Sequence, residues 1–191
     1  MIPILFRRTA VTLAAFLSLA GFAQAHPGHG GEGFAHPLHG LDHLLTMLAV
    51  GLWAAQLGGR AKWAVPAAFV SMMALGGALG MAGVAVPFAE QGIVASVLVL
   101  GVLIAAAVRL PPAASMGVVG IFALCHGYAH GAEMPATAAG FSYGLGFVGA
   151  TALLHACGIG AALAMQQLAE TRWLRATGVA ICAASVMLFL N

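Results

Sequence analysis

Histidines and carboxylates are concentrated near the start of an otherwise apolar chain, in the stretch HPGHGGEGFAHPLHGLDHLL over residues 26–45. A second group lies in the stretch CHGYAHGAE over residues 125–133. Imidazole nitrogen combined with carboxylate oxygen suits a borderline divalent cation such as Ni²⁺, Co²⁺, Zn²⁺ or Cu²⁺. Mg²⁺ and Ca²⁺ favour oxygen ligands, and Cu(I) would favour thiolates. The two stretches therefore predict a site for a divalent transition metal.

In the first stretch, helical spacing would bring several of these side chains onto one face. Asp42 and His43 follow His39 by three and four residues, which are neighbouring positions on a helix. Pro37 suits an early helical position, where a missing N–H costs nothing. His36 lies just before this helix. We therefore expect His36, His39, Asp42 and His43 to converge.

The second stretch has the same kind of spacing. His130 follows His126 by four residues, and Glu133 follows His130 by three. Side chains at these intervals form one stripe along a helix. This stripe is the second half of the predicted metal site.

The composition places both stretches in a membrane protein. The chain has 191 residues, of which 62% are hydrophobic and 6% charged, against about 25% charged in soluble domains. A net charge of +2 without a Lys/Arg cluster gives no indication of nucleic-acid binding. The cysteines, which form no CxxC pair, lie in apolar stretches and are expected to be packing residues: Cys125, Cys157 and Cys182.

The first 25 residues are typical of a secretory signal peptide. Arg7 and Arg8 give a basic start, an apolar segment follows, and Ala23-Gln24-Ala25 resembles a cleavage site. An uncleaved first helix is the alternative. After cleavage, residues 26–37 would form a His-rich periplasmic leader, in which His26 and His29 either collect metal ions or belong to an unstructured polar segment.

Six apolar segments long enough for membrane helices follow, which predicts an all-α protein with a transmembrane permease domain over residues 38–191. They cover residues 38–58, 63–83, 91–109, 113–132, 138–166 and 172–190.

The charged residues predict how these segments are oriented. Positive charge is enriched in cytoplasmic loops. The basic residues after the signal fall in three expected loops, near residues 60, 110 and 170: Arg60, Lys62, Arg109, Arg172 and Arg175. Acidic residues fall on the other side: Glu32, Glu90 and Glu133. The mature N-terminus and both His/carboxylate stretches are therefore expected at the periplasmic side of a bacterial inner membrane.

The segments HPLHGLDHLL and FALCHGYAHGAE together resemble the HupE/UreJ family, and the resemblance covers essentially the whole chain. These membrane proteins accompany hydrogenase or urease and are regarded as nickel permeases. The resemblance implies Ni²⁺ as the transported substrate, with Co²⁺ as the alternative, and the maturation of a nickel enzyme as the process served. It assigns functional roles to residues in both motifs: His36, Asp42, His43, His130 and Glu133, with His126 inside the second motif.

Glu90, His155 and two methionines each have a functional and a structural interpretation. Glu90 either contributes to the ion pathway or stabilises a helix N-terminus. His155 is either a deeper relay for the ion or a hydrogen-bonded core residue. Met72 and Met73 are expected to pack rather than to bind metal.

Other functions remain possible from the residues alone. Paired histidines also bind haem, although the neighbouring carboxylates argue against a b-type cytochrome. A metal-binding accessory or sensor protein would need the same ligands without transport. A zinc hydrolase is disfavoured because no nucleophile is evident, so we expect neither an enzyme nor a permanent cofactor. No nucleotide-binding motif is present, which leaves the energy source open among facilitated diffusion, proton coupling and an energising partner.

Overall fold

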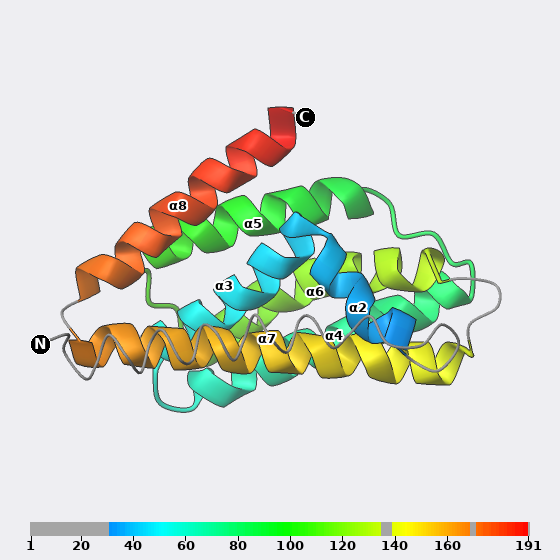
Figure 1. Ribbon diagram of the computed structural model, residues 1–191, viewed down its shortest axis with the longest axis horizontal. Helices are drawn as coiled ribbons and strands as arrows, with labels where there is room; N and C mark the ends of the chain where they lie inside the picture. Colours follow the sequence, from blue (N-terminus) through cyan, green and yellow to red (C-terminus); the bar gives the residue numbers. More distant parts are fainter. Residues whose placement is uncertain (1–30, 135–138, 169–170, 191) are drawn as a thin grey trace, which may run out of the picture.

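The computed structural model describes residues 31–134, 139–168 and 171–190, and within these ranges all the regular structure is helical. The expected signal peptide and residues 26–30 of the expected leader lie outside the described residues. Figure 1 shows the helices as an elongated bundle. The helices are α2 (Gly31–His39), α3 (Leu41–Leu57), α4 (Ala61–Met81), α5 (Ala89–Ala105), α6 (Pro112–Ala132), α7 (Gly140–Leu168) and α8 (Thr171–Leu190).

Helix α3 is the central element of the bundle. It packs against α4, α5 and α7, while α4 pairs with α6 and α5 pairs with α8. The fully buried side chains Met47, Val50 and Trp53 of α3 lie in the main hydrophobic core. A residue on α3 can therefore contact side chains from several helices at once.

The helix lengths support a membrane protein and partly match the six predicted spans. Four described helices are long and apolar enough to cross a bilayer, namely α4, α6, α7 and most of α8. The pair α2 and α3 is a fifth candidate if it is counted as one broken span. Helix α5 is apolar but has 17 residues, below the usual length of about 20.

The prediction of one helix over residues 38–58 is wrong, because the chain bends at Gly40. Gly40 has an extended backbone, with φ −91° and ψ 117°, and the axes of the two flanking helices differ by 95°. Its carbonyl oxygen accepts the first hydrogen bond of α3, from the N–H of Leu44 at 2.9 Å. Glycine is favoured at such a helix-capping position. Pro37 consequently lies in the last turn of α2, not at the start of the membrane helix.

The prediction of a helix over residues 91–109 also extends too far. Helix α5 ends at Ala105 because Ala107 adopts a left-handed conformation with φ 53°. The N–H of Val108 then donates to the carbonyl oxygen of Leu103 at 2.9 Å, which is the bond of a helix-terminating Schellman turn. Arg109 consequently lies in the exposed loop after α5.

Glycines set the close contact between α4 and α6. A Cβ atom at Gly127 would collide with the backbone carbonyl of Met73, and one at Gly131 would collide with that of Gly77. Such contacts allow helix backbones to approach closely where lipid gives no hydrophobic drive for association. The interface fixes the rotation of α6 and with it the positions of the histidines on that helix.

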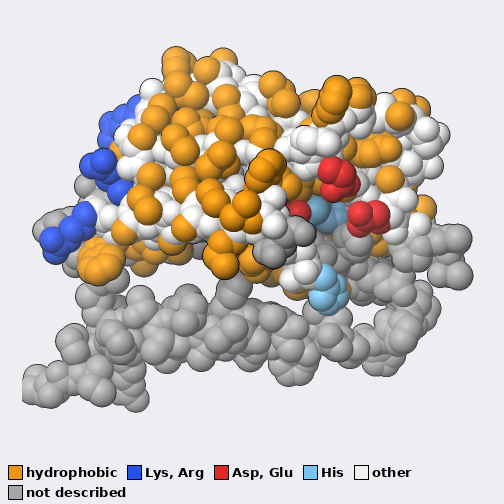
Figure 2. Space-filling view, turned by 90° about the horizontal axis from the view of Figure 1, so that it is seen from above, with side chains coloured by type: hydrophobic (Ala, Val, Ile, Leu, Met, Phe, Trp, Pro, Cys, Tyr) orange, Lys and Arg blue, Asp and Glu red, His pale blue; other side chains and the backbone are white. Residues whose placement is uncertain are grey.

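Charged side chains are segregated along the bundle. Figure 2 shows Lys and Arg at one end of the molecule, and Asp, Glu and His side chains away from that end. In Figure 1 the connections α3–α4, α5–α6 and α7–α8 lie at one end, and the connection α4–α5 lies at the other. This distribution matches the charge pattern read from the sequence.

Candidate metal centre

The two His/carboxylate stretches meet at His43. Its ring, near the start of α3, lies edge to face with two rings from α6. The ring centroids of His43 and His126 are 4.6 Å apart, with an interplanar angle of 84°, and those of His43 and His130 are also 4.6 Å apart, with an angle of 64°. The expectation that the two motifs lie close together in space is therefore met by these imidazoles.

The imidazoles of α6 are enclosed by the bundle. His126 is fully buried and His130 is 1% exposed, whereas the side chains of His43 and Asp42 are 15% and 28% exposed. The ring of His130 stacks on that of Phe147 from α7, with centroids 5.4 Å apart. Burying polar groups costs free energy unless they are hydrogen-bonded, so the partners of these imidazoles determine how they are stabilised.

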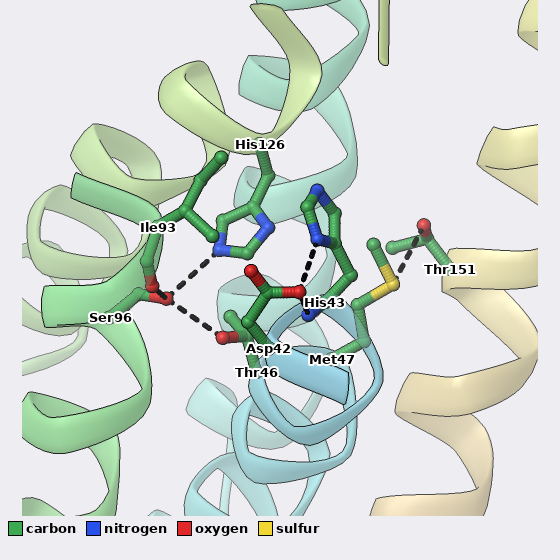
Figure 3. A network of polar contacts seen from close by, with 8 residues as sticks. All are labelled: Asp42, His43, Thr46, Met47, Ile93, Ser96, His126 and Thr151. Carbon is green, nitrogen blue, oxygen red and sulfur yellow. Dashed lines mark hydrogen bonds and ion pairs between the residues drawn. The ribbon is translucent and has the colours of Figure 1, made fainter. Parts of the chain in front are cut away.

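Asp42 orients His43. Oδ1 of Asp42 accepts a hydrogen bond from the backbone N–H of His43 at 2.7 Å and pairs with its ring Nδ1 at 2.8 Å (Figure 3). A carboxylate can only accept, so Nδ1 carries the proton and Nε2 has the free lone pair. Carboxylate–histidine pairs of this kind commonly fix metal-binding imidazoles. Asp42 thus supplies both negative charge and orientation.

Sequence reasoning missed a hydroxyl pair behind His126. Ser96 of α5 donates from Oγ to the carbonyl oxygen of Ile93 at 2.6 Å. The same Oγ lies 2.7 Å from Oγ1 of Thr46 and 2.9 Å from Nε2 of His126 (Figure 3). Thr46 follows Asp42 by four residues, so the sequence could have predicted that its hydroxyl lies on the same helix face as Asp42. Nothing in the apolar sequence around Ser96 indicates that it reaches α6.

A second, deeper layer lies one helical turn below His43. The hydroxyl of Thr151 on α7 lies 3.3 Å from Sδ of Met47 and 3.4 Å from Sδ of Met73, and all three residues are fully buried. These contacts support the expectation that Met73 is a packing residue.

His155 is separate from the outer group of imidazoles. It lies one turn below Thr151, is 2% exposed, and contacts the ring of Phe69 edge to face at a centroid distance of 5.0 Å. The ring of Phe69 also lies near that of His126, with centroids 6.0 Å apart. The Phe69 ring thus contacts both histidines, and His155 is the deeper of the two.

The structure does not place His39 on the same helix face as Asp42 and His43, so the predicted stripe is wrong at this residue. His39 ends α2 and is exposed, and the bend at Gly40 separates it from α3. His36 lies in α2, but its side chain is outside the described part of the structure.

The two other acidic candidates lie at the protein surface. Glu133 is exposed at the C-terminal cap of α6, and Glu90 is exposed in the first turn of α5. His26 and His29 fall outside the described residues.

The donor atoms are near one another but do not yet converge. Within the described ranges, no three His, Cys, Asp or Glu side chains are already spaced to enclose a metal ion. The edge-to-face orientation of His43 toward His126 and His130 accounts for this, because ligation needs nitrogen lone pairs directed at one point.

Comparison with known proteins gives two matches. The HupE / UreJ protein family matches residues 14–188. Protein HupE of Rhizobium leguminosarum bv. viciae is 47% identical over 161 residues, which cover 82% of this chain and 84% of that protein. No solved structure matches the chain.

Proposed function

This chain belongs to the HupE/UreJ family, and from that premise we propose that it is a bacterial inner-membrane permease for a divalent transition-metal ion, with Ni²⁺ as the substrate and Co²⁺ as the alternative. The uptake would serve a nickel enzyme such as hydrogenase or urease. The observation that carries the proposal is the contact of His43 with both His126 and His130 inside a bundle of apolar helices.

The proposed topology has six spans, with α2 and α3 together forming the first and α4 to α8 the others. A cleaved signal would leave the mature N-terminus in the periplasm. The end of the molecule that carries Lys and Arg would then face the cytoplasm, as expected for cytoplasmic loops. His43 and Asp42, near the start of α3, would lie at the periplasmic entrance.

At this entrance the proposed site would exchange part of the water around the ion for protein ligands. His43, His126 and His130 offer nitrogen donors, which bind metal in their neutral form. Neutral ligands do not compensate the charge of a dication, so a carboxylate is needed. Asp42 can supply it, since it is hydrogen-bonded to His43. Unpaired charge in a low-dielectric interior costs several kcal/mol.

Passage inward would use His155 as a second binding position. His155 has buried ring nitrogens that find no hydrogen-bond partner in the described part of the chain. The Phe69 ring lies near both His155 and His126, with centroid distances of 5.0 Å and 6.0 Å. Movement of the Phe69 side chain would therefore connect the outer imidazoles to His155.

The test is metal uptake by the purified protein in lipid vesicles, with labelled Ni²⁺ outside and Co²⁺, Zn²⁺ or Mg²⁺ as competitors. We expect saturable nickel uptake, competition by Co²⁺ and none by Mg²⁺, and loss of uptake in His130→Gln. The matched control is Ser142→Ala, which changes a half-buried residue of α7 whose hydroxyl donates to the carbonyl oxygen of Ala139. Nickel binding without uptake would overturn transport in favour of an accessory role, and a haem absorption spectrum would favour a cytochrome.

A further inference from the structure

The three contacts of Ser96 Oγ determine where its proton goes. A serine hydroxyl has one proton to donate and two lone pairs to accept with. The carbonyl oxygen of Ile93, 2.6 Å away, has no proton, so only the serine proton can occupy that contact. Two oxygens this close without a proton between them would repel each other. Ser96 therefore donates to Ile93 and can only accept from its other neighbours.

Because Ser96 has no second proton to donate, the direction of the other two hydrogen bonds is also determined. Thr46 Oγ1 must donate to Ser96 Oγ at 2.7 Å, and His126 Nε2 must donate to it at 2.9 Å. The two lone pairs of Ser96 are then both used. His126 Nε2 consequently carries the ring proton, and Nδ1 of the neutral imidazole has the free lone pair.

Nδ1 of His126 is a buried atom that accepts no hydrogen bond from any residue the structure describes. An unsatisfied buried polar atom is costly. His43 has the matching arrangement, because Asp42 holds the proton on its Nδ1 and leaves Nε2 buried without a hydrogen-bond partner among the described residues. Two adjacent imidazoles thus each retain one unprotonated nitrogen, and each is held at its other nitrogen by an oxygen.

We propose that Ser96, itself held by Thr46, is a positioning residue that keeps His126 protonated on Nε2 and so makes Nδ1 its metal-binding atom. The inference rests on the proposed function, because it assumes that these imidazoles bind a metal ion. In this proposal, Thr46 on α3 and Ser96 on α5 orient His126 in the way that Asp42 orients His43. Loss of such an orienting partner typically weakens metal binding by roughly 10–100-fold.

The first experiment reads the tautomer of His126 without metal. Nitrogen-15 NMR of histidine-labelled protein in lipid distinguishes a protonated from an unprotonated ring nitrogen, and His126→Gln identifies the signal among the eight histidines. We expect protonation on Nε2 in the unmodified protein. In Ser96→Ala, where the acceptor is missing, we expect a mixture of tautomers. A His126 protonated on Nδ1 in the unmodified protein would overturn the proposal.

The second experiment measures equilibrium binding of Ni²⁺ alone to the purified protein. Ser96→Ala is expected to lower the affinity by roughly 10–100-fold, and Thr46→Val by less, because Ser96 still accepts from His126. Thr46→Ser keeps the hydroxyl and should restore both affinity and tautomer. The matched control is Ser185→Ala on α8, which removes another buried serine whose Oγ donates to a carbonyl oxygen of α5, that of Val94 at 3.4 Å.

These results separate the positioning role from transport. Unchanged nickel affinity in Ser96→Ala, together with an unchanged tautomer, would show that the hydroxyl is only a packing group. If the unmodified protein bound nickel through His126 but moved none across vesicles, the proposed permease would fail while the role of Ser96 remained. A folding defect is recognised by comparing the Ser96→Ala and Ser185→Ala proteins for membrane insertion.

Discussion

Asp42 and His43 form a hydrogen-bonded pair in which one carboxylate oxygen, Oδ1, accepts from both the backbone and the ring of the next residue. The pair lies at the start of α3, where a carboxylate also interacts favourably with the helix dipole. The ring of His43 faces His126 and His130, which come from a distant part of the sequence. The first predictions concern what this pair contributes.

Asp42→Asn should reduce nickel uptake at least tenfold while the protein inserts normally. Asparagine retains an oxygen that can accept both hydrogen bonds, so His43 keeps its orientation and only the negative charge is lost. The measurement is uptake of labelled nickel per inserted protein at neutral pH. Uptake near the unmodified level would show that orientation, not charge, is the contribution of Asp42.

Glu133→Gln should have its largest effect when nickel is scarce. Glu133 is exposed at the end of α6, where solvent screens its charge, so it is expected to aid capture of the ion rather than its passage. The nickel concentration for half-maximal uptake should rise several-fold, with a smaller change in the maximal rate. An equal loss at all nickel concentrations would contradict this entrance role.

His43→Gln and His39→Gln should differ strongly, although the sequence places both residues in one motif. His43 contacts both histidines of α6, whereas His39 is exposed on α2 beyond the bend at Gly40. We expect nickel affinity to fall by at least tenfold in the first variant and less than threefold in the second. Equal losses would mean that the bend at Gly40 closes when the ion binds.

Gly40→Ala should weaken nickel binding several-fold. A Cβ at this position would lie 2.8 Å from Asp42 Oδ1 and 3.0 Å from His43 Nδ1, so the pair would have to shift. Gly117→Ala on α6 is the matched control, because an added Cβ there has no neighbour within 4 Å. Binding isotherms of the two variants provide the comparison, and identical affinities would show that the Asp42–His43 pair adapts without loss.

His155→Leu should slow uptake while leaving the equilibrium affinity of the outer site unchanged. His155 lies one helical turn deeper than Thr151, and its ring contacts Phe69, which also lies near His126. The change replaces a buried imidazole by an apolar side chain and removes the only proposed ligand at that depth. Rapid uptake into vesicles is compared with equilibrium binding in detergent. A parallel loss of affinity would indicate that His155 supports the outer site structurally.

The sequence by itself assigns the chain to the membrane proteins and locates the candidate metal-binding residues in two stretches. An apolar chain with few charges has no soluble alternative, and side chains spaced by three and four residues share a helix face wherever the helix is continuous. The stripe of His126 and His130 on α6 was predictable for this reason. The location of both motifs at the same side of the membrane could also be predicted from the alternating direction of successive spans, whereas the contact of His43 with His126 and His130 depends on how the helices pack.

The tertiary structure alone decided which residues complete the site. Helical periodicity does not show where a helix breaks, and the extended backbone at Gly40 removed His39 from the predicted stripe. Nor does it show which neighbouring helix a side chain reaches, so the hydrogen bond between Ser96 and His126 depends on how α5 packs beside α3 and α6. The protonated nitrogen of each imidazole is set by that packing, because a ring proton goes to the nitrogen whose neighbour accepts it.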